Sequence, residues 1–213
     1  MLGYLKAHYP ELLQALLEHI EICATALFLS SLLAFPLGYG LSKSGRKLTD
    51  GVLGFLGLLY AIPSMALLVL FVPMFGLGNV SATIVLSIYA QFALVRSILL
   101  GFQNIDPSLL EAGRGMGLSP LQMLLWVELP LALPAIIGGL RLSTSSIIGL
   151  ASMGAFINAG GLGGLLFEGI YQNHAAKIFW GTLLIVGLAL SAEWVLWDVE
   201  RHALREAQGE AGA

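Results

Sequence analysis

Charged side chains are scarce in this sequence: Asp, Glu, Lys and Arg make up 11% of its 213 residues. A soluble domain of this length carries about a quarter charged residues, so the composition excludes an ordinary water-soluble protein. The net charge is -3, and without a basic patch or an RNA motif we expect no nucleic-acid partner. The single cysteine, Cys23, cannot form a disulfide within the chain.

Motifs for catalysis and metal binding are also missing. The stretch from Gly40 to Gly45 has the glycine spacing of a phosphate-binding loop, but Arg46 and Lys47 follow where Lys and Ser or Thr are required. The four histidines are scattered and form no zinc motif. We therefore predict no enzymatic activity, no metal site and no cofactor in this chain, and any energy for transport must come from another subunit.

Long apolar runs dominate what is present, with 57% hydrophobic residues and a mean hydropathy of +0.86. Five segments reach about 20 residues or more, which is long enough to cross the hydrocarbon of a bilayer. The sequence thus predicts an all-α integral membrane protein with about five transmembrane helices and a kink at Pro63. The predicted spans are Ile22–Leu41, Gly51–Phe75, Val80–Phe102, Leu131–Ile157 and Ala176–Trp197.

The regions outside these spans give the domain organisation. Residues 1–21 are too polar for a signal peptide and have the pattern of an amphipathic helix, which we expect to lie on the membrane surface. Residues 22–198 form the transmembrane domain, and 199–213 form a tail.

Lys and Arg mark one side of the predicted membrane protein. They occupy the connection after the first span, the 104–130 loop between the third and fourth spans, and the tail, whereas only Lys6 and Lys177 lie on the other side. The positive-inside rule then places the N-terminus outside, and the 104–130 loop and C-terminus in the cytoplasm.

The sequence from Asp106 to Pro134 has two helix starts. Asp106 and Ser119 can each cap a helix, and each is followed by a proline at the first helical position. Gln122 is at the capping-box position for Ser119. Gly113, Gly115 and Gly117 separate the two helices, and Pro130 and Pro134 mark the expected return to the membrane.

This loop resembles the EAA loop of ABC importer permeases. Glu111-Ala112-Gly113, three residues, Gly117, nine residues and Val127-Glu128-Leu129-Pro130 match the family spacing, with Gly113 in place of the second Ala and Val127 in place of Ile. The resemblance implies that the loop couples the permease to an ATPase. The implied ATPase-coupling residues are Leu109, Leu110, Glu111, Ala112, Gly113, Arg114, Met116, Gly117 and Leu118.

The same resemblance implies a type I ABC importer transmembrane domain in a bacterial or archaeal cytoplasmic (inner) membrane. The implied partners are separate ATPase subunits that use ATP and Mg, an extracytoplasmic substrate-binding protein and a second permease copy, most simply as a homodimer.

Further elements indicate the branch of the family. Ile62-Pro63-Ser64 and Gly160-Gly161-Leu162-Gly163 are similar to the osmoprotectant permeases for glycine betaine, carnitine and choline. The glycine-rich element is similar to the methionine permeases too, so an amino-acid importer is the alternative. A channel or secondary carrier would show ion-coupling carboxylates at mid-membrane or inverted repeats, and neither is found.

Polar residues within the spans are candidates for a translocation path. The candidates are Tyr60, Pro63, Ser64, Arg141, Ser143 and Thr144. Helix–helix hydrogen bonding would use the same hydroxyl groups, Arg141 could instead extend to the interface, and Pro63 could be a passive kink. The Asn158–Gly164 loop is either a simple turn or an outer gate or docking surface.

Overall fold

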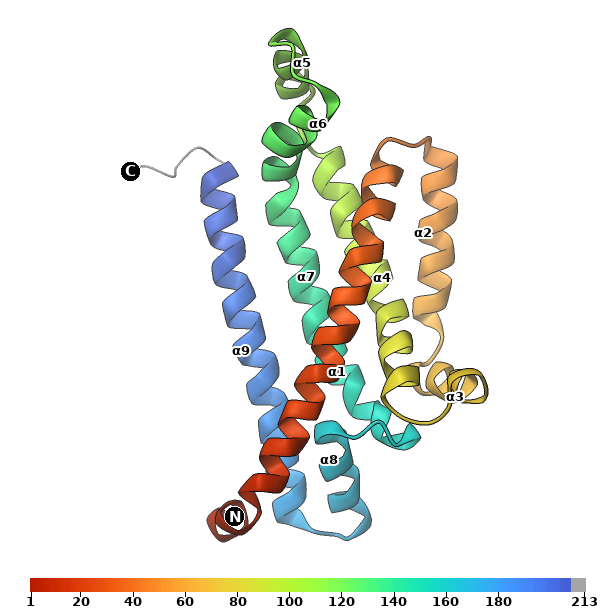
Figure 1. Ribbon diagram of the computed structural model, residues 1–213, viewed down its shortest axis with the longest axis vertical. Coiled ribbons are helices and arrows are strands. Elements are labelled where there is room, and N and C mark those ends of the chain that lie inside the picture. Colours follow the sequence, from red (N-terminus) through yellow and green to blue (C-terminus); the bar gives the residue numbers. More distant parts are fainter. Residues whose placement is uncertain (208–213) are drawn as a thin grey trace.

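Four long helices run side by side along the molecule, and a bent pair of shorter ones lies beside them (Figure 1). The computed structural model describes residues 1–207, apart from the side chains of Leu2, Glu206 and Ala207. The elements are α1 (Leu2–Ser42), α2 (Arg46–Ala61), α3 (Ser64–Phe75), α4 (Asn79–Gln103), α5 (Pro107–Gly115), α6 (Pro120–Met123), η1 (Leu124–Glu128), α7 (Leu129–Ala151), η2 (Ser152–Ile157), α8 (Gly161–Tyr171) and α9 (Ala175–Ala207). No strand occurs in residues 1–207.

Helix α4 forms the centre of the bundle. It packs on α1 and on α7, and α9 covers another side of α7. Of the most apolar window of α4, 61% is buried, against 6% for α9. The apolar surface of α9 therefore faces out of this chain, where lipid or another subunit can cover it.

The number of membrane spans agrees with the sequence if the bent pair counts as one. Residues 1–207 contain four helices long and apolar enough to cross a membrane, and α2 with α3 makes a fifth candidate. The second predicted span is not a single helix, because α2 and α3 meet at 93°. Pro63 disfavours helical backbone at the preceding residue, and Ile62 is accordingly extended, with ψ 132°.

The predicted boundary at residue 21 has no counterpart in the helices. Helix α1 runs from Leu2 to Ser42, and its only non-helical backbone lies at His8, two residues before Pro10. The ring of a proline interferes with the preceding turn of a helix, which explains this position. Whether residues 1–21 lie on the membrane surface stays a prediction.

The Asn158–Gly164 loop leads into α8 through two glycines in the left-handed region. Gly160 and Gly161 have φ of +75° and +72°, which other residues rarely adopt. The Gly161 N–H donates to Glu18 Oε2 at 3.0 Å, so the loop is fastened to α1. Helix α8 begins at Gly161 and so includes the last four residues of this loop.

Gly163 marks the closest approach of α8 to the preceding segment. A Cβ added at Gly163 would overlap the backbone carbonyl of Ser152, whereas a Cβ at Gly164 would meet nothing within 4 Å. We expect Gly163→Ala to lower the free energy of unfolding by about 1–3 kcal/mol through overpacking. Gly164→Ala is the matched control and should leave stability unchanged or slightly raised. Thermal unfolding of the two variants in detergent measures the difference, and equal midpoints would contradict this packing.

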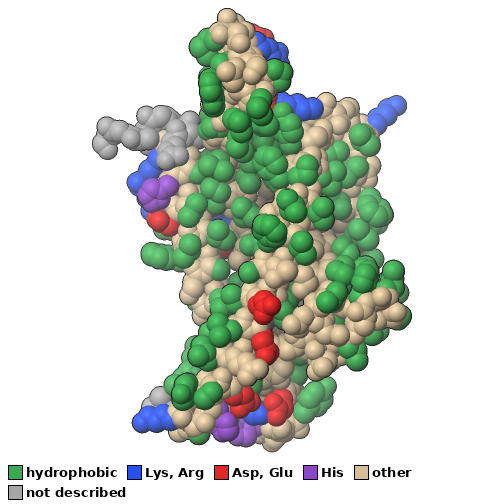
Figure 2. Space-filling view, viewed as in Figure 1, with side chains coloured by type: hydrophobic (Ala, Val, Ile, Leu, Met, Phe, Trp, Pro, Cys, Tyr) green, Lys and Arg blue, Asp and Glu red, His purple; other side chains and the backbone are tan. Residues whose placement is uncertain are grey.

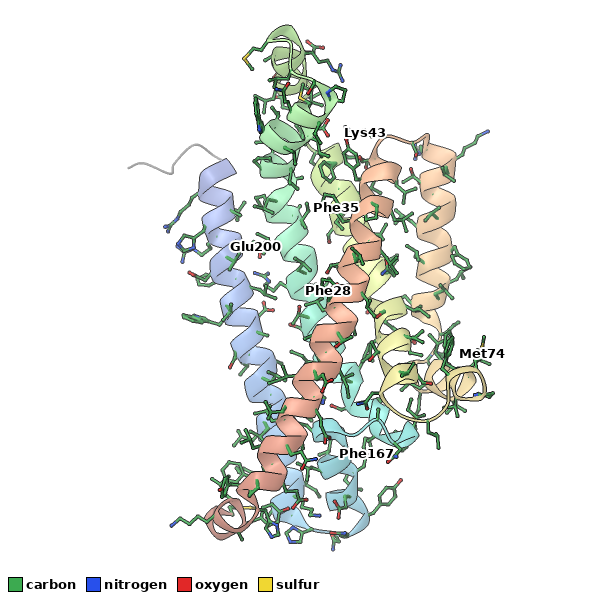
Figure 3. The ribbon with its side chains drawn as sticks, in the orientation of Figure 1. Phe28, Phe35, Lys43, Met74, Phe167 and Glu200 are labelled. Carbon is green, nitrogen blue, oxygen red and sulfur yellow. The ribbon has the colours of Figure 1, made fainter. Side chains whose placement is uncertain are left out.

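Apolar and basic side chains occupy different parts of the surface along the long axis of the molecule. In Figure 2 the middle of the visible face is mostly apolar, and Lys and Arg lie mainly toward the two ends. Phe28, which Figure 3 labels near the middle of α1, is 67% exposed. This distribution suits a bilayer around the middle of the bundle.

Candidate functional site

Helix α5 starts with the cap that the sequence predicts. The Ser108 N–H donates to Asp106 Oδ1 at 2.8 Å, and Pro107 occupies the first turn. This hydrogen bond lowers the pKa of the Asp106 carboxyl below its ordinary value, because it favours the charged form. The cap is therefore retained at neutral pH and weakens as the pH falls through that lowered pKa.

The end of α5 is a Schellman motif around Gly117. The Leu118 N–H donates to the Gly113 carbonyl at 3.2 Å, and the Gly117 N–H donates to the Arg114 carbonyl at 3.0 Å. Gly117 has φ +77°, the left-handed conformation that this helix end requires. The glycine of the EAA-like spacing thus has a specific backbone role here, which is to turn the chain from α5 into α6.

Helix α6 starts with a complete capping box. The Ser119 N–H donates to Gln122 Oε1 at 2.8 Å, and the Gln122 N–H donates to Ser119 Oγ at 3.4 Å. The backbone then stays helical from Pro120 through η1 and α7 to Ile157. The second half of the loop is therefore part of one continuous rod with a membrane-spanning helix.

Pro130 and Pro134 do not interrupt this rod, although the sequence suggests a boundary there. Pro130 lies in the first turn of α7 and Pro134 lies inside it. The preceding element η1 is a π-helical turn, which is wider than an α-helical turn. We attribute the continuity to this turn, since it leaves room for a proline that cannot donate a hydrogen bond.

The nine predicted coupling residues divide into two sets. Gly113 is buried, and a Cβ there would lie 2.6 Å from Met123 Cε. Leu110 and Leu118 are half-buried. The exposed members are Leu109, Glu111, Ala112, Arg114, Met116 and Gly117. Leu109 is 46% and Met116 73% exposed, so apolar and charged groups share an open surface at the tip of the molecule (Figure 1).

An ion pair absent from the sequence predictions fastens this loop to α1. Lys43 Nζ lies 2.7 Å from Glu128 Oε1, and the Glu128 side chain is buried. Figure 3 labels Lys43 at the end of α1 that adjoins the loop. The signal in the sequence was a lone carboxylate, Glu128, in an apolar stretch near a cluster of basic residues, but only the fold identifies Lys43 as its partner.

The predicted path residues do not all come together. Tyr60 lies at the end of α2, beside the break at Ile62 and Pro63, and Ser64 begins α3. Tyr60 lines a pocket with residues of α4 and α7. The Tyr89 hydroxyl donates to the Ile62 carbonyl that the break leaves without a helical partner. Tyr60, Pro63 and Ser64 are thus neighbours at one corner of the bundle.

Arg141, Ser143 and Thr144 lie elsewhere on α7. Arg141 pairs with Glu193 at 3.1 Å and with Glu200 at 2.7 Å, both on α9, where Figure 3 labels Glu200. Ser143 is buried, and the Thr144 hydroxyl donates to the Leu140 carbonyl. Successive residues of a helix point about 100° apart, so a run of adjacent polar residues faces several neighbours. A role for these three in the path stays a prediction.

Comparison with known proteins identifies the family. Residues 27–197 match the model for "Binding-protein-dependent transport system inner membrane component". The chain belongs to this family. It is a multi-pass membrane permease of the ABC importer type, as the resemblance implied.

Two curated relatives match over nearly the whole chain. The choline transport system permease protein OpuBB of Bacillus subtilis (strain 168) is 35% identical over 93% of this chain and 91% of its own. The glycine betaine/carnitine/choline transport system permease protein OpuCB of the same organism is 34% identical over 94% and 92%. These names agree with the osmoprotectant branch indicated by the sequence.

The fold matches a solved importer. A chain of the MetNI methionine ABC transporter in an inward-facing conformation superposes with a TM-score of 0.82, at 24% identity, over 90% of this chain and 95% of that one. The predicted type I ABC importer transmembrane fold is thereby confirmed.

Proposed function

We propose that this permease forms the membrane path for a small quaternary ammonium solute such as glycine betaine, carnitine or choline. The observation that carries the proposal is the match to permeases named for these solutes at 34–35% identity over 93–94% of the chain. A methionine-type importer shares the fold, but a structural likeness at 24% identity supports the fold alone.

The α5–α6 segment is the proposed contact with a separate ATPase. It presents Leu109 and Met116 as exposed apolar groups beside Glu111 and Arg114, a combination of apolar anchors and charged rim that protein interfaces use. Its second half is continuous with α7. Movement of the tip would therefore reach the bundle as a rigid-body displacement of that helix.

The proposed assembly has two permease copies, ATPase subunits that bind ATP and Mg, and an extracytoplasmic substrate-binding protein. The loop end of the bundle lies in the cytoplasm and α8 lies outside, as the distribution of Lys and Arg predicts. The two permeases are identical copies of this chain. Mass measurement of the purified complex tests this point, and a second, different permease would contradict it.

Transport by the reconstituted complex tests the function. We expect ATP-dependent uptake of at least one quaternary ammonium solute into liposomes that hold the permease, its ATPase and its binding protein, and no uptake when the ATPase is omitted. Methionine is the control solute. Uptake of methionine without uptake of betaine, carnitine or choline would establish the amino-acid alternative.

A further inference from the structure

An open pocket of about 310 Å³ lies between α2, α4 and α7 and is lined by both aromatic and polar side chains. Tyr60 comes from α2, Phe92, Arg96 and Ser97 come from α4, and Ser146 comes from α7. The volume is at the lower end of the range for small-molecule sites. It is therefore suited to a compact solute.

Aromatic rings form one side of this pocket. The ring of Tyr60 lies 5.4 Å from that of Phe92 and 5.7 Å from that of Tyr89, measured between centroids. Tyr60 is 45% exposed, whereas Tyr89 is buried and held through its hydrogen bond to Ile62. Exposed aromatic faces attract quaternary ammonium groups through cation–π interactions.

Arg96 provides a positive charge on the adjacent wall. It lies within the apolar span Asn79–Gln103, is exposed, and has no ion-pair partner among the side chains that the structure describes, those of residues 1–205 apart from Leu2. Arg141, by comparison, has two carboxylate partners on α9. An arginine within a span that lacks such a partner is costly and points to a functional site. Its guanidinium group is the donor best suited to a carboxylate.

The spacing of these groups fits a short zwitterion. Phe92 and Arg96 are four residues apart on α4 and share one face, about 6 Å apart along the helix axis. A small molecule with a quaternary ammonium group and a carboxylate separates its charges by a few bonds, which is compatible with this distance. Ser97 lines the same pocket and carries a hydroxyl group that can donate to a carboxylate. The Ser146 hydroxyl, also in the lining, donates to the Leu142 carbonyl at 2.9 Å.

We propose that this pocket binds a zwitterionic quaternary ammonium carboxylate, of the betaine or carnitine class, with its ammonium group on Tyr60 and Phe92 and its carboxylate on Arg96. The inference rests on the proposed function and deepens it by naming the solute class that this chain itself selects. Choline carries the same ammonium group but no carboxylate, so Arg96 repels it without any compensating contact. The path therefore favours betaine and carnitine over choline.

Uptake rates in proteoliposomes, measured with the complete complex at solute concentrations below saturation, test this selectivity. We expect Arg96→Gln to lower betaine uptake about tenfold, as for loss of a charge-assisted hydrogen bond, and to leave choline uptake equal or higher. Tyr60→Leu should lower the uptake of both solutes, and Tyr60→Phe should retain both. Arg46→Gln and Phe28→Leu are matched controls, since Arg46 and Phe28 are exposed outside the pocket.

The possible outcomes test the pocket assignment and the proposed function separately. If the wild-type complex imports betaine, but Arg96→Gln changes betaine and choline uptake equally or not at all, the pocket assignment is wrong and the proposed function stands. If the wild-type complex imports no quaternary ammonium solute, both are rejected. Should Arg96→Gln fail to assemble, the Tyr60 pair decides: equal uptake by Tyr60→Leu and Tyr60→Phe overturns the pocket.

Discussion

Replacement of Gly117 by valine is expected to lower solute uptake about tenfold or more while the protein still inserts and assembles. Gly117 has φ +77° in the Schellman turn between α5 and α6. A β-branched residue in that conformation is strained by about 1–3 kcal/mol, and each 1.4 kcal/mol is a factor of ten in the population of the native turn. The tip of the loop would then no longer hold α5 in its orientation relative to α7.

Two substitutions act as controls for Gly117→Val. Gly117→Asn should retain much of the uptake, because asparagine tolerates the left-handed conformation. Gly115 is the last residue of α5, and a Cβ added there would meet nothing within 4 Å, so Gly115→Ala should be neutral or slightly stabilising. Uptake and solute-stimulated ATPase activity measure the effect, and size-exclusion chromatography of the solubilised complex checks its assembly. Wild-type uptake by Gly117→Val would show that this turn does not transmit the ATPase cycle.

Substitution of Lys43 by methionine should destabilise the protein more than substitution of Glu128 by glutamine. Lys43→Met leaves the buried Glu128 carboxylate without its partner at 2.7 Å, a loss that costs about 3–5 kcal/mol when a buried pair is broken. Glu128→Gln removes the buried charge instead, and the Lys43 side chain, 47% exposed, can turn to water. The two single substitutions therefore lower the stability by different amounts, although both break the same ion pair.

Thermal unfolding in detergent measures this asymmetry. The double variant Lys43→Met with Glu128→Gln should be more stable than Lys43→Met alone, since no buried charge is left unpaired. Arg46→Met is the control, because the Arg46–Asp50 pair is 3.5 Å long with side chains 94% and 68% exposed, and such pairs contribute about 0–1 kcal/mol. Equal losses in the two single variants would contradict the unpaired buried carboxylate of Glu128 as the cause of the destabilisation.

The capping of the loop could be predicted because it depends on neighbouring residues. Asp106 with Ser108, and Ser119 with Gln122, are two and three positions apart. The same short range explains why Pro63 pointed to a kink, although the 93° angle between α2 and α3 depends on how α3 packs on α4 and η2. The rod from Pro120 to Ile157 was not foreseen, since its continuity depends on a π-helical turn that no residue type marks.

The path candidates show the limit of reasoning from sequence position. Arg141, Ser143 and Thr144 stand within four positions, yet the structure turns Arg141 to α9 and buries Ser143. The pocket instead combines Tyr60 with Phe92, Arg96 and Ser146 from two other helices. Polarity alone identified the side chains in the spans that cost free energy to place in a membrane. The direction in which each of them points follows from helix packing.

The sequence by itself determined that this is a helical membrane protein, how many apolar segments it has, and where two short helices start in the loop. Composition and hydrophobic runs are sums over residues, and helix caps are local contacts, so neither requires knowledge of the fold. Only the tertiary structure decided that Lys43 meets Glu128, 85 positions away, that Ser145 meets Glu193, 48 positions away, and that Tyr60 and Arg96 share a pocket. These contacts exist because the apolar faces of the helices pack in one register. That register brings together polar groups that lie far apart in the sequence.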